Sequence, residues 1–127
     1  MTIKSSQTLV NEALEQVKTI SPEEALKLFE DKKCNLIDIR DIRELQKEGK
    51  IEGSLHMPRG MLEFWLDQNS PYSKSVDHQK EIVLFCAGGL RSALAAKSLN
   101  EMGFKKVSHI DGGFAAMKIK GFKIDQS

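Results

Sequence analysis

The sequence predicts an α/β domain with a mainly parallel central sheet flanked by helices. Strand-like and helix-like segments alternate along its 127 residues, which is typical of this class. Residues 81–86 form an almost continuous apolar run, as parallel strands covered on both faces tend to do. Capping residues and glycines stand where the helical segments begin and end. A chain of this length usually forms one domain and folds without a metal or disulfide.

The expected elements follow the chain in order. Residues 7–18 form a helix with one apolar stripe, which consists of Val10, Ala13, Leu14 and Val17. Ser21 caps a second helix that runs to about Glu30, with Pro22 in its first position and Glu24 completing a capping box. A strand at 34–39 precedes a helix at 41–48 that Gly49 ends. The remaining segments are a short strand at 53–58, helical turns at 61–66, a loop at 69–73, the strand at 81–86, a helix at 92–102, a strand at 106–110, a turn at 111–113 and a helix at 114–119.

Composition excludes several classes of function. The net charge of +1 provides no basic surface for nucleic acid, and no apolar run approaches the ~18–20 residues of a membrane span. The N-terminus lacks the apolar core of a secretion signal, so we expect a cytoplasmic protein. We expect no metal and no cofactor. The three histidines have no metal-ligand spacing with the cysteines, and the glycine motifs that bind nucleotides are absent.

Cys86 stands where a site is expected, at the carboxyl end of the buried strand. Gly88 and Gly89 let the following loop curl so that backbone N–H groups point inward, and the next helix adds its positive end. A cysteine in such a cradle should ionise near neutral pH and act as a nucleophile. Arg91 supplies a positive charge at the rim that can hold an oxyanion. The competing interpretation is a buried structural cysteine, which is common at the end of an apolar strand.

Five segments of the chain carry motifs in a fixed order. The cysteine loop and its helix run from Cys86 to Ala96, and the other segments are Leu36 to Arg40, Gly49 to Ser54, Pro58 to Trp65 and Met102 to Met117. These five segments resemble those of single-domain rhodaneses. The resemblance covers roughly residues 20–122, with residues 1–19 as an N-terminal helical extension and 20–127 as the rhodanese-like domain. Lys50, Ser54 and Met117 depart from the residues usual in the family at those positions.

The resemblance implies a thiosulfate sulfurtransferase. Its cysteine thiolate takes the outer sulfur of a donor such as thiosulfate, releases sulfite, and passes the sulfur from the persulfide to a thiophilic acceptor. Cyanide is the acceptor in vitro, and a thiol-bearing protein is another. Cys86 is then the catalytic residue. The expected substrate-binding residues are Ala87, Gly88, Gly89, Leu90, Arg91, Ser92 and Arg59.

Two alternatives remain open. Phosphatases of the same fold also use a cysteine, but their loop has five residues between cysteine and arginine, whereas four separate Cys86 from Arg91. A persulfide carrier or binding module is the non-enzymatic alternative. The intact Cys86 argues against a module that has lost its cysteine, but the sequence does not separate a carrier from an enzyme.

Several further residues have a structural and a functional interpretation. Asp38 and Arg40 point to opposite faces if their strand is regular, and we expect them to support the site through an ion pair or hydrogen bond. Arg59 either borders the site and attracts an anionic donor or is a solvated surface residue. Cys34 is expected to fill the core, with a resolving thiol as the alternative. The N-terminal stripe is expected to pack on its own chain, with a homodimer surface as the alternative.

Overall fold

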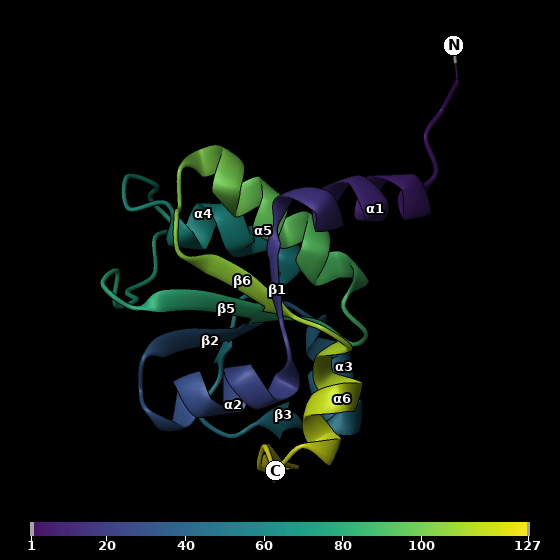
Figure 1. The fold of residues 1–127 in the computed structure, drawn as a ribbon. Helices are drawn as coiled ribbons and strands as arrows, with labels where there is room; N and C mark the ends of the chain where they lie inside the picture. Colours follow the sequence, from purple (N-terminus) through teal and green to yellow (C-terminus); the bar gives the residue numbers. More distant parts are fainter. Residues whose placement is uncertain (1, 127) are drawn as a thin grey trace.

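A computed structural model describes residues 2–126 and has a five-stranded sheet. The sheet lies at the centre of the fold (Figure 1). All of its neighbouring strands are parallel, in the order β1-β6-β5-β2-β4. The strands are β1 (Lys18–Ile20), β2 (Cys34–Asp38), β4 (Leu55–His56), β5 (Glu81–Phe85) and β6 (Val107–Ile110). A separate antiparallel pair joins β3 (Lys50–Ile51) to β7 (Ile124–Asp125). The predicted α/β class is therefore confirmed.

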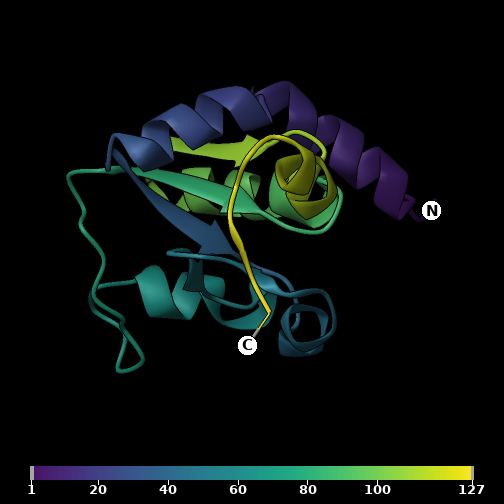
Figure 2. The same cartoon turned by 90° about the horizontal axis from the view of Figure 1, so that it is seen from below.

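Helices cover both faces of this sheet, as Figures 1 and 2 show from two directions. The helices are α1 (Ser6–Gln16), α2 (Pro22–Glu30), α3 (Ile42–Glu48), α4 (Leu62–Leu66), α5 (Leu90–Met102) and α6 (Gly113–Ile119), with a 3-10 turn, η1, at Arg59–Met61. Leu62 and Leu99, from α4 and α5, pack on one face of the sheet. Ala25 and Phe114, from α2 and α6, pack on the other. No helix within residues 2–126 is long and apolar enough to cross a membrane.

The helix starts and ends confirm the local predictions. Ser21 and Glu24 form the expected capping box of α2, and Asp41 and Glu44 form a second one at α3. Gly103 ends α5 in the left-handed region, with φ 105°. Such caps satisfy backbone groups that a helix leaves unpaired at its ends, and this explains why the sequence marks these boundaries so clearly.

The N-terminal segment differs from the prediction in one respect. Helix α1 ends at Gln16, and Lys18–Ile20 forms the edge strand β1, which the sequence did not predict. Val10 and Ala13 pack against Ala93 of α5 in the same chain, as expected for the stripe. Leu14, which belongs to the predicted stripe, is 41% exposed. The division of the chain at residue 19 remains a prediction, and the last residues of that segment lie within the sheet.

Candidate functional site

Cys86 follows β5 directly and lies at the carboxyl edge of the parallel sheet. Its side chain is buried, with an exposed fraction of 1%. The loop that begins at Cys86 leads into α5, whose N-cap, Gly89, has a φ of 103°. A side chain rarely adopts this left-handed conformation, so glycine suits the position. The curled loop predicted from the two glycines is therefore present.

Two backbone N–H groups point at the Cys86 sulfur. Gly89 N–H donates to Sγ over 3.2 Å and Ser92 N–H over 3.4 Å, and both belong to the start of α5. The thiol also lies 3.6 Å from the Ser92 hydroxyl oxygen, within hydrogen-bonding range for sulfur. N–H donors at a helix start carry partial positive charge, so they stabilise a negative charge on this sulfur. The arrangement suits a thiolate or a persulfide anion.

The loop rests on the start of α6. Phe114 N–H donates to the Cys86 carbonyl over 2.8 Å, and Ala115 N–H donates to the Ala87 carbonyl over 3.3 Å. Gly113 has a φ of 56°, and a Cβ atom added there would lie 2.4 Å from the Cys86 carbonyl oxygen. The glycine turn at 111–113 was expected, and it also lets α6 approach the loop closely enough to hold the backbone of Cys86.

Arg91 already has a carboxylate partner. Its guanidinium forms two hydrogen bonds with Glu44 of α3, at 2.7 and 3.0 Å. These bonds hold the pKa of the Glu44 carboxyl below its usual range and raise the pKa of Arg91. The Arg91 side chain is 42% exposed. The sequence does not reveal Glu44 as a partner because the two residues lie 47 positions apart and nothing local links them.

The rest of the predicted loop is open or half-open to solvent. Gly88 is exposed, and a Cβ atom added to it would meet no other atom within 4 Å. Leu90 is 56% exposed, and Ala87 is half-buried. The loop therefore holds the sulfur on its inner side and presents Gly88 and Leu90 to solvent on its outer side.

Asp38 and Arg40 form a fully buried ion pair. Arg40 Nη2 donates to Asp38 Oδ2 over 2.8 Å, and Arg40 Nη2 also donates to the Gly49 carbonyl. The guanidinium carbon lies 3.9 Å from the centre of the Phe114 ring. The predicted ion pair is confirmed, whereas the expectation of opposite faces is wrong because side chains two residues apart along an extended chain point to the same side. Through Phe114, the pair supports the helix under the cysteine loop.

Arg59 lies in η1, near the carboxyl end of β2. Its N–H donates to the Ile39 carbonyl, so its backbone is at the same edge of the sheet as Cys86. Its guanidinium is held by Glu63 over 2.8 Å, in an ion pair one helical turn apart. Its role as a donor-attracting residue remains a prediction.

Cys34 is not placed to resolve Cys86. It lies at the start of β2 and pairs with Glu81, whereas Cys86 is five residues further along β5. At ~3.3 Å per residue this separates the two cysteines by about 16 Å, far beyond the Cα distance that a disulfide spans. Burial raises the pKa of the Cys34 thiol to about 11, so it stays protonated and unreactive at neutral pH. The core interpretation is confirmed.

A buried histidine joins the cysteine loop to the edge strand. His109 of β6 is 1% exposed, and its Nδ1 lies 2.9 Å from the Ser92 hydroxyl. Its Nε2 lies 2.9 Å from the hydroxyl of Thr19, the residue paired with it on β1. Burial lowers the pKa of His109, with Asp111 opposing the shift, so the ring is neutral at pH 7. The sequence alone did not predict a role for His109, although a histidine among the apolar residues of a buried strand needs polar partners.

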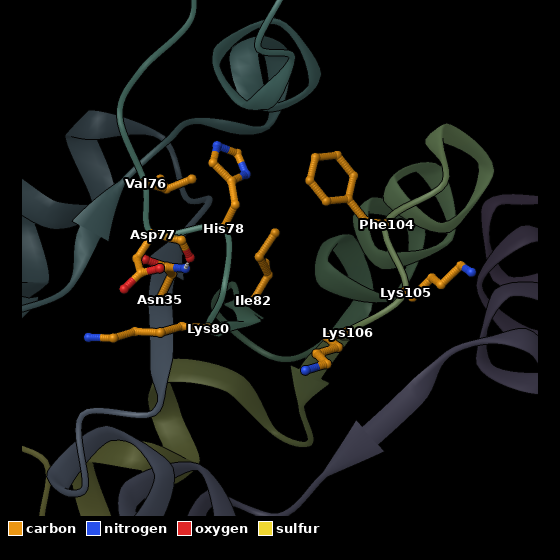
Figure 3. A pocket seen from close by; sticks show the side chains of 9 residues that line it. All are labelled: Asn35, Val76, Asp77, His78, Lys80, Ile82, Phe104, Lys105 and Lys106. Atoms are coloured by element: carbon orange, nitrogen blue, oxygen red, sulfur yellow. Dashed lines mark hydrogen bonds between the residues drawn. The ribbon is translucent and has the colours of Figure 1, made fainter.

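The other features of the described chain lie apart from the cysteine. Among residues 2–126, no group of three histidine, cysteine, aspartate or glutamate side chains could hold a metal ion. A hollow of about 240 Å³ lies at the amino ends of β2, β5 and β6. Figure 3 shows the side chains that line it, among them Ile82, Phe104 and three lysines. The hollow is at the opposite edge of the sheet from Cys86, so it does not belong to this site.

Comparison with known proteins identifies the family. The family model of the rhodanese-like domain matches the sequence over residues 21–120. The chain belongs to the rhodanese-like family. Thiosulfate sulfurtransferase GlpE of Coxiella burnetii (strain RSA 331 / Henzerling II) is 32% identical over 80% of this chain and 87% of its own. YrkF of Bacillus subtilis (strain 168), named as a candidate sulfur carrier protein, is 32% identical over 72% of this chain. This rhodanese-like chain spans about half of YrkF, with 48% covered.

Solved structures agree with this rhodanese-like fold. A Rhodopseudomonas palustris protein, RPA3614, is 43% identical with a TM-score of 0.90 over 98% of both chains. It is described as a protein of unknown function and possible tyrosine phosphatase. The polysulfide-sulfur transferase homodimer of Wolinella succinogenes is 34% identical with a TM-score of 0.75, over 94% of this chain and 85% of that one. Sulfur transfer is thus the activity named for relatives of this rhodanese-like chain.

Proposed function

We propose that the protein is a sulfurtransferase that carries sulfane sulfur on Cys86, with thiosulfate as a donor. The observation that carries the proposal is the pair of N–H donors, from Gly89 and Ser92, on a cysteine sulfur at the start of a helix. These donors stabilise negative charge on sulfur in both halves of the reaction, so no separate base has to be present at the moment of attack. The sulfur-transfer names of GlpE and the Wolinella succinogenes protein support the same conclusion.

The first half of the reaction forms a persulfide. The Cys86 thiolate attacks the outer sulfur of thiosulfate, the S–S bond of thiosulfate breaks, and sulfite leaves with the electron pair of that bond. The negative charge then lies on the outer sulfur of the persulfide. The N–H groups that stabilised the thiolate lie beside this charge, and the exposed, unobstructed backbone at Gly88 leaves room for the added atom.

The second half discharges the persulfide. A thiophilic acceptor attacks the outer sulfur, the S–S bond to Cys86 breaks, and the thiolate is restored. With cyanide the product is thiocyanate. With an acceptor thiol, on a small molecule or a protein, the product is a new persulfide. Because the two substrates react in separate steps at one cysteine, ping-pong kinetics are expected.

The test compares the two cysteines by the same substitution. Wild-type protein, Cys86→Ala and Cys34→Ala are incubated with thiosulfate alone for intact mass, and with thiosulfate and cyanide for thiocyanate. We expect wild type and Cys34→Ala to gain one sulfur atom and to form thiocyanate, and Cys86→Ala to do neither. Cys34→Ala is the matched control because that thiol is buried and far from the site. A sulfur adduct on the Cys86→Ala protein contradicts the proposal.

Two other outcomes separate the alternatives. Adduct formation without turnover on cyanide or small thiols indicates a carrier that serves one protein acceptor, as the name of YrkF suggests for that relative. Hydrolysis of a phosphate ester, lost in Cys86→Ala, indicates a phosphatase, as the description of RPA3614 suggests for that protein. The four-residue spacing from Cys86 to Arg91 favours sulfur transfer. We further propose a cytoplasmic location.

The oligomeric state needs its own measurement. The Wolinella succinogenes protein is described as a homodimer. Here, Val10 and Ala13 of α1 pack on Ala93 in the same chain, which supports a monomer, while Leu14 on α1 remains 41% exposed. Light scattering of the whole chain and of a chain without residues 1–17 distinguishes a monomer from a homodimer. A dimer that becomes a stable monomer on deletion assigns the interface to α1.

A further inference from the structure

Three polar side chains connect the buried cysteine to the protein surface. The Cys86 thiol lies 3.6 Å from Ser92 Oγ, which lies 2.9 Å from His109 Nδ1. On the other side of the ring, His109 Nε2 lies 2.9 Å from Thr19 Oγ1. Cys86, Ser92 and His109 are at most 1% exposed, whereas Thr19 is exposed at the edge of the sheet. A continuous chain of hydrogen-bonding atoms therefore runs from the buried sulfur to solvent.

The fold explains why these groups line up. Thr19 and His109 are register partners on neighbouring parallel strands, so their side chains share one face of the sheet. That face is covered by α5, which contributes Ser92 from its first turn. β1 lies just outside residues 21–120, the part of the chain that matches the family model. The outer end of the chain of hydrogen bonds thus comes from a segment outside the matched family domain.

We propose that Ser92, His109 and Thr19 form a proton relay that carries the Cys86 thiol proton to the β1 edge and stabilises the thiolate, because the shifted relay turns the Ser92 hydroxyl hydrogen toward the sulfur. The proposal deepens the proposed sulfurtransferase function and rests on it for its purpose. His109 acts as a positioning and relay residue, because Ser92 separates it from the sulfur.

The proton balance follows from the donors and acceptors. Neutral His109 with its hydrogen on Nε2 accepts at Nδ1, so Ser92 donates its hydroxyl hydrogen to Nδ1 and receives the thiol proton. The S–H bond breaks and its electron pair stays on Cys86. The Nε2 hydrogen passes to Thr19, whose own hydroxyl hydrogen goes to water. With Nδ1 now protonated, His109 donates to the Ser92 oxygen, and Ser92 turns its hydrogen toward the thiolate. Return of a proton along the same path restores the starting tautomer.

The groups around the ring are consistent with this role. The charged or titratable groups that act on His109 are Asp111, just beyond β6, and Cys86 through Ser92. From helix α5 and strand β1, the groups hydrogen-bonded to the ring are the hydroxyls of Ser92 and Thr19. The ring therefore has one acceptor position and one donor position, each with a hydroxyl partner.

The test titrates the Cys86 thiolate by its ultraviolet absorbance, which needs no reagent to reach the buried sulfur. Each variant is compared with the same variant carrying Cys86→Ala as a blank. Cys34 does not interfere at neutral pH because burial raises its pKa to about 11. The variants are His109→Asn, whose amide still forms hydrogen bonds but cannot take up a proton at one atom and release one from another, and the exposed pair Thr19→Val and Thr19→Ser. Circular dichroism and urea unfolding check that each variant is folded.

We expect His109→Asn to move the thiolate midpoint to higher pH by about one pH unit, which lowers the thiolate fraction at pH 7 by up to tenfold. Thr19→Val should move the midpoint in the same direction by less, and Thr19→Ser should match wild type. A wild-type titration for His109→Asn or for Thr19→Val overturns the relay. Thr19→Val keeps the test decisive if His109→Asn fails to fold, because it changes an exposed β-branched residue to another good strand former.

The thiolate titration tests the relay independently of the proposed sulfurtransferase function. Thiolate titration needs no sulfur donor, so its outcome does not depend on thiosulfate being a substrate. If wild type takes no sulfur from any donor while the variants still move the titration midpoint, the relay stands and the sulfurtransferase proposal falls. If wild type forms the persulfide while the variants titrate as wild type, the sulfurtransferase proposal stands and the relay falls.

Discussion

Replacing Gly113 with alanine is expected to displace the cysteine loop, which rests on the start of α6. Gly113 has a φ of 56°, and an added Cβ atom would lie 2.4 Å from the Cys86 carbonyl oxygen and 2.8 Å from the Ala87 carbonyl atoms. These are backbone atoms, so no side-chain rotation relieves the contact. Either α6 or the loop has to move, and the 2.8 Å hydrogen bond from Phe114 N–H to the Cys86 carbonyl then weakens.

Two energies set the size of the effect. A left-handed backbone costs an L-residue about 1–2 kcal/mol. Weakening the hydrogen bond to Cys86 adds ~1 kcal/mol. Together they predict a loss of about 2–3 kcal/mol in the free energy of unfolding, or a fall of roughly 10 °C in Tm for a domain of this size. A displacement of the nucleophile by a fraction of an ångström to about 1 Å should also slow sulfur loading on Cys86 by ~10- to 100-fold.

The assay pairs Gly113→Ala with Gly103→Ala. Gly103 also has a left-handed φ, of 105°, but a Cβ atom there would meet nothing within 4 Å. Urea unfolding gives the stability of each protein, and intact mass over time with thiosulfate gives the rate of persulfide formation. We expect Gly103→Ala to lose about 1 kcal/mol and to load sulfur at the wild-type rate. Equal stability losses and equal loading rates for the two variants refute the reasoning.

Three further predictions follow from the same structure. Glu44→Gln removes the charge that neutralises Arg91, so the KM for thiosulfate should fall by about two- to fivefold, as expected for an exposed pair of ~0.5–1 kcal/mol; an unchanged KM in steady-state kinetics contradicts a role for Arg91 in donor binding. Arg40→Met leaves Asp38 buried without its partner, so urea unfolding should show a loss of about 3–5 kcal/mol, and a loss below about 1 kcal/mol would show that water reaches the carboxylate. Burial raises the folded-state pKa of Cys34 to about 11, above its unfolded value. The contribution of this thiol to the free energy of unfolding is therefore complete below the unfolded pKa and is lost as pH rises toward 11. Wild type should therefore lose ~2 kcal/mol more than Cys34→Val between about pH 8 and 11 in urea unfolding, and parallel pH profiles would show that the thiol is solvated.

Local patterns predicted the larger elements because each has a local cause. The capping box at Ser21 and the apolar run from Ile82 mark boundaries that the structure reproduces. The short strands β1, β3 and β7 were missed for a physical reason. Lys18 and Thr19 are exposed and polar, and β3 and β7 have two residues each, so these segments become strands only through pairing with a partner far along the chain.

The same difference between local patterns and long-range contacts decides which site residues the sequence predicted. The position of Cys86 follows from the buried strand that it ends and the glycines after it, so the sequence predicted it. Glu44 and His109 were missed because their contacts with Arg91 and Ser92 join different elements of the fold. Either partner becomes visible from sequence only when the strand order and the face of each strand are already known.

The edge strand β1 also decides how far the protein can be shortened. Residues 21–120 match the family model, but a chain cut to that range loses β1 and exposes the backbone N–H and C=O groups with which β6 pairs to it. It also loses β7, the partner of β3. An uncovered parallel edge is a template for strands of other molecules, so the shortened protein is expected to self-associate and precipitate during purification. For expression and crystallisation, the functional unit of this protein is therefore longer than its family domain at both ends.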